Sequence, residues 1–304
     1  MIRRSFVSSL AALLLLLIAP QAARAAEPAA AKPAKGKPGA EQVRFERLLE
    51  RSTRERFAAN PSLATYLGVH DFDTQLENTS KASVEAQAAA MRRALDELGT
   101  IDKAKLDADG RIDYDLFASD LKGRLFRATE VKEWEKDPGA YGYGWSIDNL
   151  IARNFAPPKT RLRAVIARLR QVPRQFDNGR ANVKNPAELL ARFSAEDLEG
   201  LVAYLDNDVP HAFPTVKDKA LWKEYDAAKL EAQKATRAYV KWIREDLLPN
   251  AHGTYVLGED AFRKRLLYEE MIDLPIDSLL SIGMRELYRL EARYEDAAAR
   301  VAPG

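Results

Sequence analysis

The sequence contains no cysteine among its 304 residues. Disulfides, a lipid-modified N-terminal cysteine and a thiol nucleophile are therefore excluded. Histidine is almost as scarce, because the chain holds only His70, His211 and His252. None of these has a second histidine one helical turn away, so a His-Glu-x-x-His zinc motif is absent. The sequence predicts no metal site and no cofactor in this chain; a composite site built from all three histidines in space is the remaining alternative.

Glycine-rich phosphate loops and Gly-x-Ser-x-Gly nucleophile turns are also missing. A surplus of one charge is missing as well, since 47 basic residues face 45 acidic ones. Residues 1–25 hold three of the arginines and no acid, so the remainder has 44 basic and 45 acidic residues and a formal net charge of −1. With both signs interspersed, no basic face is expected to collect phosphates, and nucleic acid is not an expected partner.

Long hydrophobic segments are limited to one stretch of ten residues, Leu10 to Ala19. It follows Arg3 and Arg4 and precedes the small-residue site Ala23-Arg24-Ala25, which is typical of a secretory signal peptide. A retained membrane anchor is the alternative, but the stretch is half of the roughly 20 residues that span a bilayer. We predict a signal peptide at residues 1–25, no stable membrane anchor after cleavage, and a periplasmic or secreted protein.

Residues 26–40 are rich in alanine, proline and lysine, which is typical of a flexible linker. From residue 41 to 304 the apolar residues recur with helical spacing. The clearest seam contains Leu221, Tyr225, Ala228, Ala232, Ala235, Tyr239 and Trp242. Prolines are expected to separate helices, with one helix ending at Pro173 and a connection at Val209-Pro210.

Strand signals are nearly absent, and the best candidate is the four-residue segment Thr254-Tyr255-Val256-Leu257. It predicts one edge of a short hairpin or a plain extended loop. The sequence therefore predicts an all-α fold of about nine or ten helices, with at most one short hairpin.

Two loops carry residues that could bind a ligand or transfer a proton. In the first, Gly68 can end a helix, and His70, Asp71 and Asp73 follow within five residues. This pattern indicates either a loop that contacts substrate or carries a proton, or a histidine that caps a helix beside carboxylates that form turns. The second loop, Trp134 to Trp145, has four aromatic residues and three glycines. It can offer flat surfaces to a ligand, although packing between helices explains the same composition.

The order of several short segments resembles the bacterial domain of unknown function 885 (DUF885) family, over nearly all of residues 44–300. The segments that carry the resemblance include Asn60-Pro61, Gly68 with His70 and Asp73, Ile112-Asp113-Tyr114-Asp115, Asp137-Pro138 with Tyr141, Val172-Pro173, Asp246-Leu247-Leu248-Pro249 and Leu257-Gly258. No single segment is specific, but their order and spacing together match the family.

Members of that family are similar to helical zinc peptidases of the thermolysin-like clan, in which two helical halves close a long cleft. The resemblance implies that residues 41–304 form the incomplete N-terminal half of a larger domain and one wall of that cleft. The family's His-Glu-x-x-Pro-Gly-His type zinc motif lies in the second half, so zinc is expected only in a full-length relative. By resemblance, Gly68, His70, Asp73 and Tyr141 are expected to face the substrate channel, and no catalytic role is transferred to them.

The resemblance therefore implies the N-terminal part of an exported zinc-metallopeptidase-like hydrolase that acts on a peptide-like small substrate. We expect this chain to be inactive alone and expect the missing C-terminal half to pack on its final helices. The alternative function is a non-catalytic periplasmic helical module that binds a peptide or a protein.

Overall fold

The computed structural model describes residues 38–302. The signal peptide expected at residues 1–25, and the linker as far as residue 37, lie outside this range. Within it the chain forms twelve α-helices, ten of them eight residues or longer, and no strand, which confirms the predicted all-α fold. Thr254-Tyr255-Val256-Leu257 is an extended loop without strand pairing. The α-helices are α1 (Ala40–Ala59), α2 (Pro61–Tyr66), α3 (Lys81–Leu98), α4 (Ala108–Phe126), α5 (Glu133–Lys136), α6 (Gly144–Ile151), α7 (Pro158–Leu169), α8 (Val172–Asn182), α9 (Glu188–Ala212), α10 (Lys219–Trp242), α11 (Glu259–Glu269) and α12 (Ile276–Val301).

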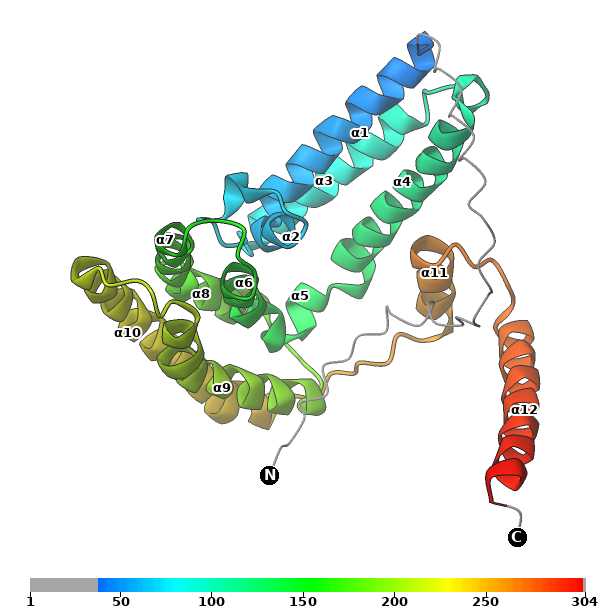
Figure 1. Cartoon of the computed structure of the whole chain (residues 1–304). Helices are drawn as coiled ribbons and strands as arrows, with labels where there is room; N and C mark the ends of the chain where they lie inside the picture. The colour runs from blue at the N-terminus through cyan, green and yellow to red at the C-terminus, as the bar shows by residue number, and fades with distance from the viewer. Residues whose placement is uncertain (1–37, 303–304) are drawn as a thin grey trace. The chain divides into compact units, whose positions relative to one another are not determined.

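Helices α1, α3 and α4 lie side by side and enclose the smaller of two hydrophobic cores (Figure 1). Their buried residues recur every three or four positions, such as Phe45 and Leu48 in α1 and Ala88 and Met91 in α3. This spacing places them on one side of each helix, so the three helices bury a shared stripe.

The larger core lies among α6 to α10, where α10 packs against α7, α8 and α9. The predicted seam on α10 is confirmed, because Leu221, Tyr225, Ala228, Ala232 and Tyr239 are all buried. The small alanines in the middle of the seam allow close approach of the neighbouring helices, and the aromatic rings fill the wider spaces at its ends.

The two proline-based expectations have different outcomes. The helix before Pro173 ends as expected, at Leu169, but Pro173 itself lies in the first turn of α8, where a missing N–H costs no intrahelical hydrogen bond. Pro210 lies inside the last turn of α9, which continues to Ala212 instead of ending at Val209. Proline therefore marks a helix start at one position and is tolerated at a helix end in the other.

The last two helices differ in how they pack. Helix α11 lies against α4, where the Ser119 hydroxyl donates a 2.6 Å hydrogen bond to the Tyr268 carbonyl. Helix α12 buries none of its residues within the described part of the chain. Over residues 38–302, no helix is both long enough and apolar enough to cross a membrane.

Candidate functional site

The first predicted loop begins where α2 ends, at Gly68. Its φ of 85° lies in the left-handed region that glycine adopts without strain. The Val69 N–H donates a 2.8 Å hydrogen bond to the Ala64 carbonyl, which closes the end of the helix. A short 3-10 turn, His70–Phe72, follows directly. Gly68 thus turns the chain so that His70 and Asp73 follow within one turn of each other.

The structure brings His70 and Asp73 into contact. The His70 Nδ1 lies 3.1 Å from Asp73 Oδ2, and the Thr65 hydroxyl lies 2.7 Å from Asp73 Oδ1. Because a carboxylate only accepts hydrogen bonds, both contacts are donated to Asp73. The carboxylate is mostly buried, with 14% of its side chain exposed, against 35% for His70. Asp73 therefore orients an imidazole that reaches the surface.

Arg168 supports this pair from the interior. It is completely buried, and its Nη2 donates a 2.7 Å hydrogen bond to the Thr65 hydroxyl. Burial lowers the pKa of Arg168, and the carboxylates of Glu77 and Asp73 oppose that shift. A buried cation, a hydroxyl, a carboxylate and an imidazole therefore form one chain of contacts from the core to the surface.

The His70 ring is also fixed by stacking. It lies flat on Phe155, with ring centroids 3.8 Å apart and an interplanar angle of 8°. With Nδ1–H bound to Asp73, neutral His70 keeps its lone pair on Nε2, which has no hydrogen-bond partner within residues 38–302. This arrangement can accept a hydrogen bond or a proton from a ligand at the surface.

The second predicted loop divides between the core and the surface. Tyr141 and Tyr143 are 1% exposed, and Trp134 is half-buried. The Tyr141 hydroxyl donates to the Trp134 carbonyl at 2.6 Å and accepts from the Asn182 amide at 3.0 Å. Burial raises the pKa of Tyr143 to about 12. Packing between helices thus accounts for three of the four aromatic residues, and Tyr141 is buried whereas Gly68 and His70 reach the surface.

Trp145 is the fourth aromatic residue, and half of its surface is exposed. It lines a groove of about 450 Å³ between the glycine-rich loop and α9. The groove is lined by Asp137, Gly139, Gly142, Gly144, Trp145, Leu190, Phe193, Ser194, Asp197, Leu198 and Leu201. We call it the aromatic groove. The α9 side of the groove was not predicted from the sequence, although Phe193 is a large aromatic residue off the stripe that α9 buries.

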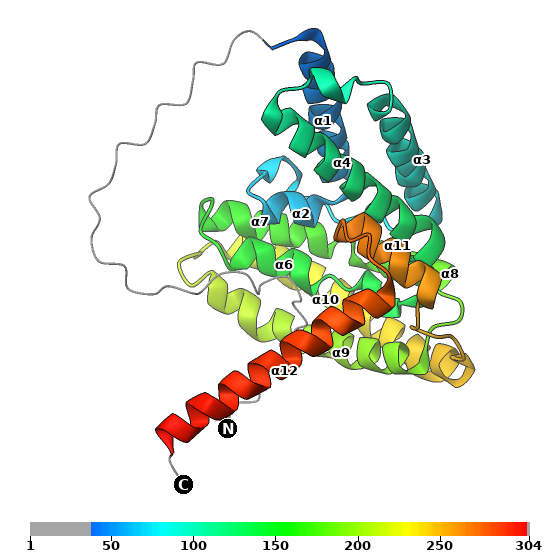
Figure 2. The same ribbon diagram turned by 90° about the vertical axis from the view of Figure 1, so that its right-hand side faces the viewer.

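The aromatic groove and His70 lie on neighbouring elements. Helices α2 and α6 are in contact (Figure 2), and the Tyr66 and Trp145 rings lie 5.7 Å apart. The Arg153 guanidinium lies 4.8 Å from the centre of the Tyr66 ring and donates a hydrogen bond to the Tyr66 carbonyl. Tyr66 is therefore the link between the two predicted loops.

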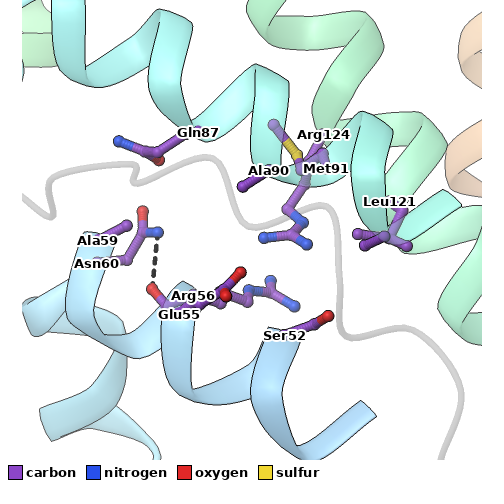
Figure 3. Close-up of a pocket in the computed structure, with 11 residues that line it drawn as sticks. Ser52, Glu55, Arg56, Ala59, Asn60, Gln87, Ala90, Met91, Leu121 and Arg124 are labelled. Carbon is purple, nitrogen blue, oxygen red and sulfur yellow. Dashed lines mark hydrogen bonds between the residues drawn. The ribbon is translucent and has the colours of Figure 1, made fainter. Parts of the chain in front are cut away.

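A separate cavity of about 40 Å³, lined by apolar and charged side chains, lies among α1, α3 and α4. Figure 3 shows the guanidinium groups of Arg56 and Arg124 turned toward each other across it. Both guanidiniums pair with Asp120, at 3.0 Å each, and the Glu55 side chain lies at the same cavity. The charges of the two arginines are balanced by those of Asp120 and Glu55, so the cavity selects neither anionic nor cationic ligands.

The described residues do not fit a resident metal. Across residues 38–302 there is no group of three histidine or carboxylate side chains that could hold a metal ion. His70 Nδ1 is bound to Asp73, and His211 Nδ1 lies 2.9 Å from the carbonyl of Asn207, one turn earlier in α9. Zinc chemistry is therefore not assigned to any residue between 38 and 302.

The helical fold and the order of the motifs define an all-α domain of a known bacterial class. The chain belongs to the family described as bacterial protein of unknown function (DUF885), whose model matches residues 61–304. The predicted family is thereby confirmed. Comparison with curated proteins gives no match.

A solved structure shares the fold. It is described as that of a "putative lipoprotein of unknown function" from Shewanella oneidensis, with a TM-score of 0.74 and 20% sequence identity. The match covers 85% of this chain and 48% of that protein. This chain therefore spans about half the length of the protein that it resembles in structure.

Proposed function

We propose that this chain forms the peptide-binding wall of an exported, metallopeptidase-like hydrolase. The observation that carries the proposal is that the Asp73-oriented His70 and the aromatic groove lie on neighbouring elements, which are joined by the contact between Tyr66 and Trp145. An exposed aromatic surface next to a polar group of fixed orientation is typical of ligand sites. Export is supported by the signal-peptide pattern at residues 1–25 and by the description of the Shewanella protein as a lipoprotein.

In this proposal the residues of this chain bind and orient the substrate. His70 Nε2 accepts a hydrogen bond from a peptide amide, and Asp73 keeps the imidazole in the tautomer that makes this possible. Trp145 and Phe193 supply apolar contact area for a side chain. Gly68 positions the loop, while the buried Tyr141 holds the start of the Trp134–Trp145 loop through its hydrogen bond to the Trp134 carbonyl.

The metal and the general base of such a hydrolase would come from residues outside this chain. The length of the Shewanella protein supports this division, since its matched part is 48% of the whole. We propose that the exposed stripe of α12 packs on that remaining part in a protein of full family length. The apolar residues of this stripe include Leu280, Leu287, Leu290 and Tyr294.

The second candidate is a non-catalytic periplasmic module that binds a peptide or a protein. The aromatic groove favours it, because Trp145 and Phe193 need no metal to bind a ligand. The two candidates share the binding surface and differ in what the rest of the protein does.

Elemental analysis and a peptidase assay distinguish them. We expect residues 26–304 to bind peptide without binding stoichiometric zinc and without hydrolysing the peptide. A version extended through the downstream reading frame should gain both zinc binding and hydrolysis. An extended version that binds peptide, but neither binds zinc nor hydrolyses the peptide, would favour the second candidate, the non-catalytic binding module. One tightly bound zinc and chelator-sensitive activity in residues 26–304 alone would contradict the division of roles.

A further inference from the structure

The aromatic groove has a composition that selects one kind of side chain. Its volume of about 450 Å³ is within the range of small-ligand sites, roughly 300–1,000 Å³. Three of its lining residues are the glycines of the loop before and at the start of α6. A Cβ at Gly139 would lie 2.8 Å from the Ser194 hydroxyl, and one at Gly144 would lie 2.8 Å from a Leu201 methyl. The loop backbone is thus held close against α9, and the groove is a built feature of this contact.

Two aromatic rings border the groove from opposite elements. Trp145 on α6 is 52% exposed, and Phe193 on α9 is 53% exposed. Rings of this size are usually buried in a helical domain, so two exposed ones at a single groove mark a surface that binds something. The face of an aromatic ring attracts a cation as well as apolar groups.

The charged residues of the groove are both acidic. Asp137 and Asp197 line it, and no lysine or arginine of residues 38–302 does. Asp137 Oδ1 already accepts hydrogen bonds from the Gly139 N–H at 2.8 Å and the Ser194 hydroxyl at 3.2 Å. Asp197 makes no hydrogen bond or ion pair within residues 38–302. Its carboxylate is therefore available to a ligand.

No neighbouring cation on α9 neutralises that carboxylate. Arg192 precedes Phe193 in the chain, but it is ion-paired with Glu188 one turn earlier. The groove thus combines two ring faces, aliphatic walls and a carboxylate without a partner. A lysine or arginine side chain matches all three, since its methylene stem packs on apolar walls while its charged end meets rings and carboxylate.

We propose that the aromatic groove binds a lysine or arginine side chain of a peptide, with Asp197 as its charge partner. The inference rests on the proposed function, because it names the side chain that the peptide-binding wall selects. It assigns specificity to Asp197 and contact area to Trp145 and Phe193.

The test uses the full chain and two blocked pentapeptides, one with a central arginine and one with citrulline, its neutral isostere, at the same position. Isothermal titration calorimetry should show that the arginine peptide binds at least about tenfold more tightly. Asp197→Asn should reduce this ratio to about one to threefold while circular dichroism shows an unchanged fold. Glu196→Gln, the matched control on the adjacent exposed position of α9, should leave the ratio intact.

The outcomes separate the two proposals. Equal binding of both peptides, or an unchanged ratio in Asp197→Asn, would overturn the cation proposal and leave the peptide-binding wall standing. If neither peptide nor a norleucine analogue binds, both proposals fail. A preference for arginine that weakens with added salt and disappears in Asp197→Asn supports the assignment.

Discussion

Arg168 shows how a single residue can shape a site that it does not enter. It is fully buried, and within residues 38–302 no carboxylate lies within ion-pairing distance of it. Its charge is met instead by the carbonyls of Ser146 and Pro61 and by the Thr65 hydroxyl. A buried charge is retained only where such contacts offset its desolvation. Because Thr65 also contacts Asp73, the arginine fixes the position of the His70 partner.

Asp120 holds two arginines, so its removal should be costly. In Asp120→Asn, the Arg56 and Arg124 guanidiniums would face each other across the cavity in Figure 3 without their shared anion. Breaking a fully buried pair costs about 3–5 kcal/mol. Because a third of the Asp120 side chain is exposed, we expect a smaller loss, about 1–2 kcal/mol. Urea denaturation of the purified variant measures it.

Two further variants control this experiment. Asp177→Asn removes an exposed partner of Arg180 that lies 3.7 Å away, and it should leave stability unchanged within about 0.5 kcal/mol. Adding Arg124→Met to Asp120→Asn removes the unpaired charge and should recover part of the loss. A double variant that is less stable than Asp120→Asn would show that the Arg124 charge was not the cause.

At the scale of the element, two helical glycines make opposite predictions. A Cβ at Gly179 in α8 would lie 2.4 Å from the Tyr239 hydroxyl oxygen and 3.0 Å from the Tyr141 ring. At Gly200 in α9 it would meet nothing within 4 Å. Gly179→Ala should therefore cost about 1–3 kcal/mol through overpacking. Gly200→Ala should gain up to about 1 kcal/mol through helix propensity. Thermal melts of both variants test this, and equal shifts would contradict the close packing of α8.

Helix positions were largely predictable because apolar spacing is a local signal. The α10 seam needed only the residues of α10 itself. Helix α8 was not expected, because Pro173 indicates a helix end and a first-turn position equally well, and only the packing of Phe176 distinguishes them. For the loop from Trp134 to Trp145 the sequence left two interpretations open, a ligand surface and packing between helices. Composition could not show that Tyr141 and Tyr143 point inward and Trp145 outward.

Only part of the candidate site could be predicted from the sequence. His70 and Asp73 are three residues apart, so their pairing could be expected from local geometry. Phe155, in the loop before α7, and Arg168, in α7, contact this part of the site from about 80 to 100 positions away in the sequence. Contacts of this range depend on how whole helices pack, which the pattern of a single segment does not contain.

For the whole domain, buried tyrosines predict sensitivity to alkali. Burial raises the pKa values of Tyr143, Tyr204, Tyr225 and Tyr239, that of Tyr143 to about 12. Above the ordinary tyrosine pKa of 10.0, the unfolded chain loses protons that the folded chain keeps. The stabilising contribution of these neutral tyrosines is therefore complete below about pH 10, and it is lost as the pH rises through their pKa values in the folded protein. Denaturant unfolding across this range should show falling stability.

Tyr143→Phe tests the origin of that fall. It keeps the buried ring and removes the ionisable hydroxyl, which lies 3.1 Å from the Thr236 hydroxyl. The decline between about pH 10 and 12 should become shallower, while stability near neutral pH drops by about 1 kcal/mol from the lost hydrogen bond. A flat stability profile for the unsubstituted protein over that interval would show that these tyrosines are accessible to solvent.

At the scale of the whole molecule, the exposed stripe of α12 predicts how the domain associates in solution. Helix α12 buries no residue against the rest of residues 38–302, and Leu287 and Leu290 are each about half exposed on its apolar stripe. An uncovered stripe of this kind favours association, so sedimentation velocity should show concentration-dependent self-association. Leu287→Lys with Leu290→Lys should abolish it without lowering the melting temperature, because no core packing is lost. Arg293→Gln, on the charged side, should change neither property. A chain that stays monomeric at high concentration would show that the stripe is covered by a segment of its own.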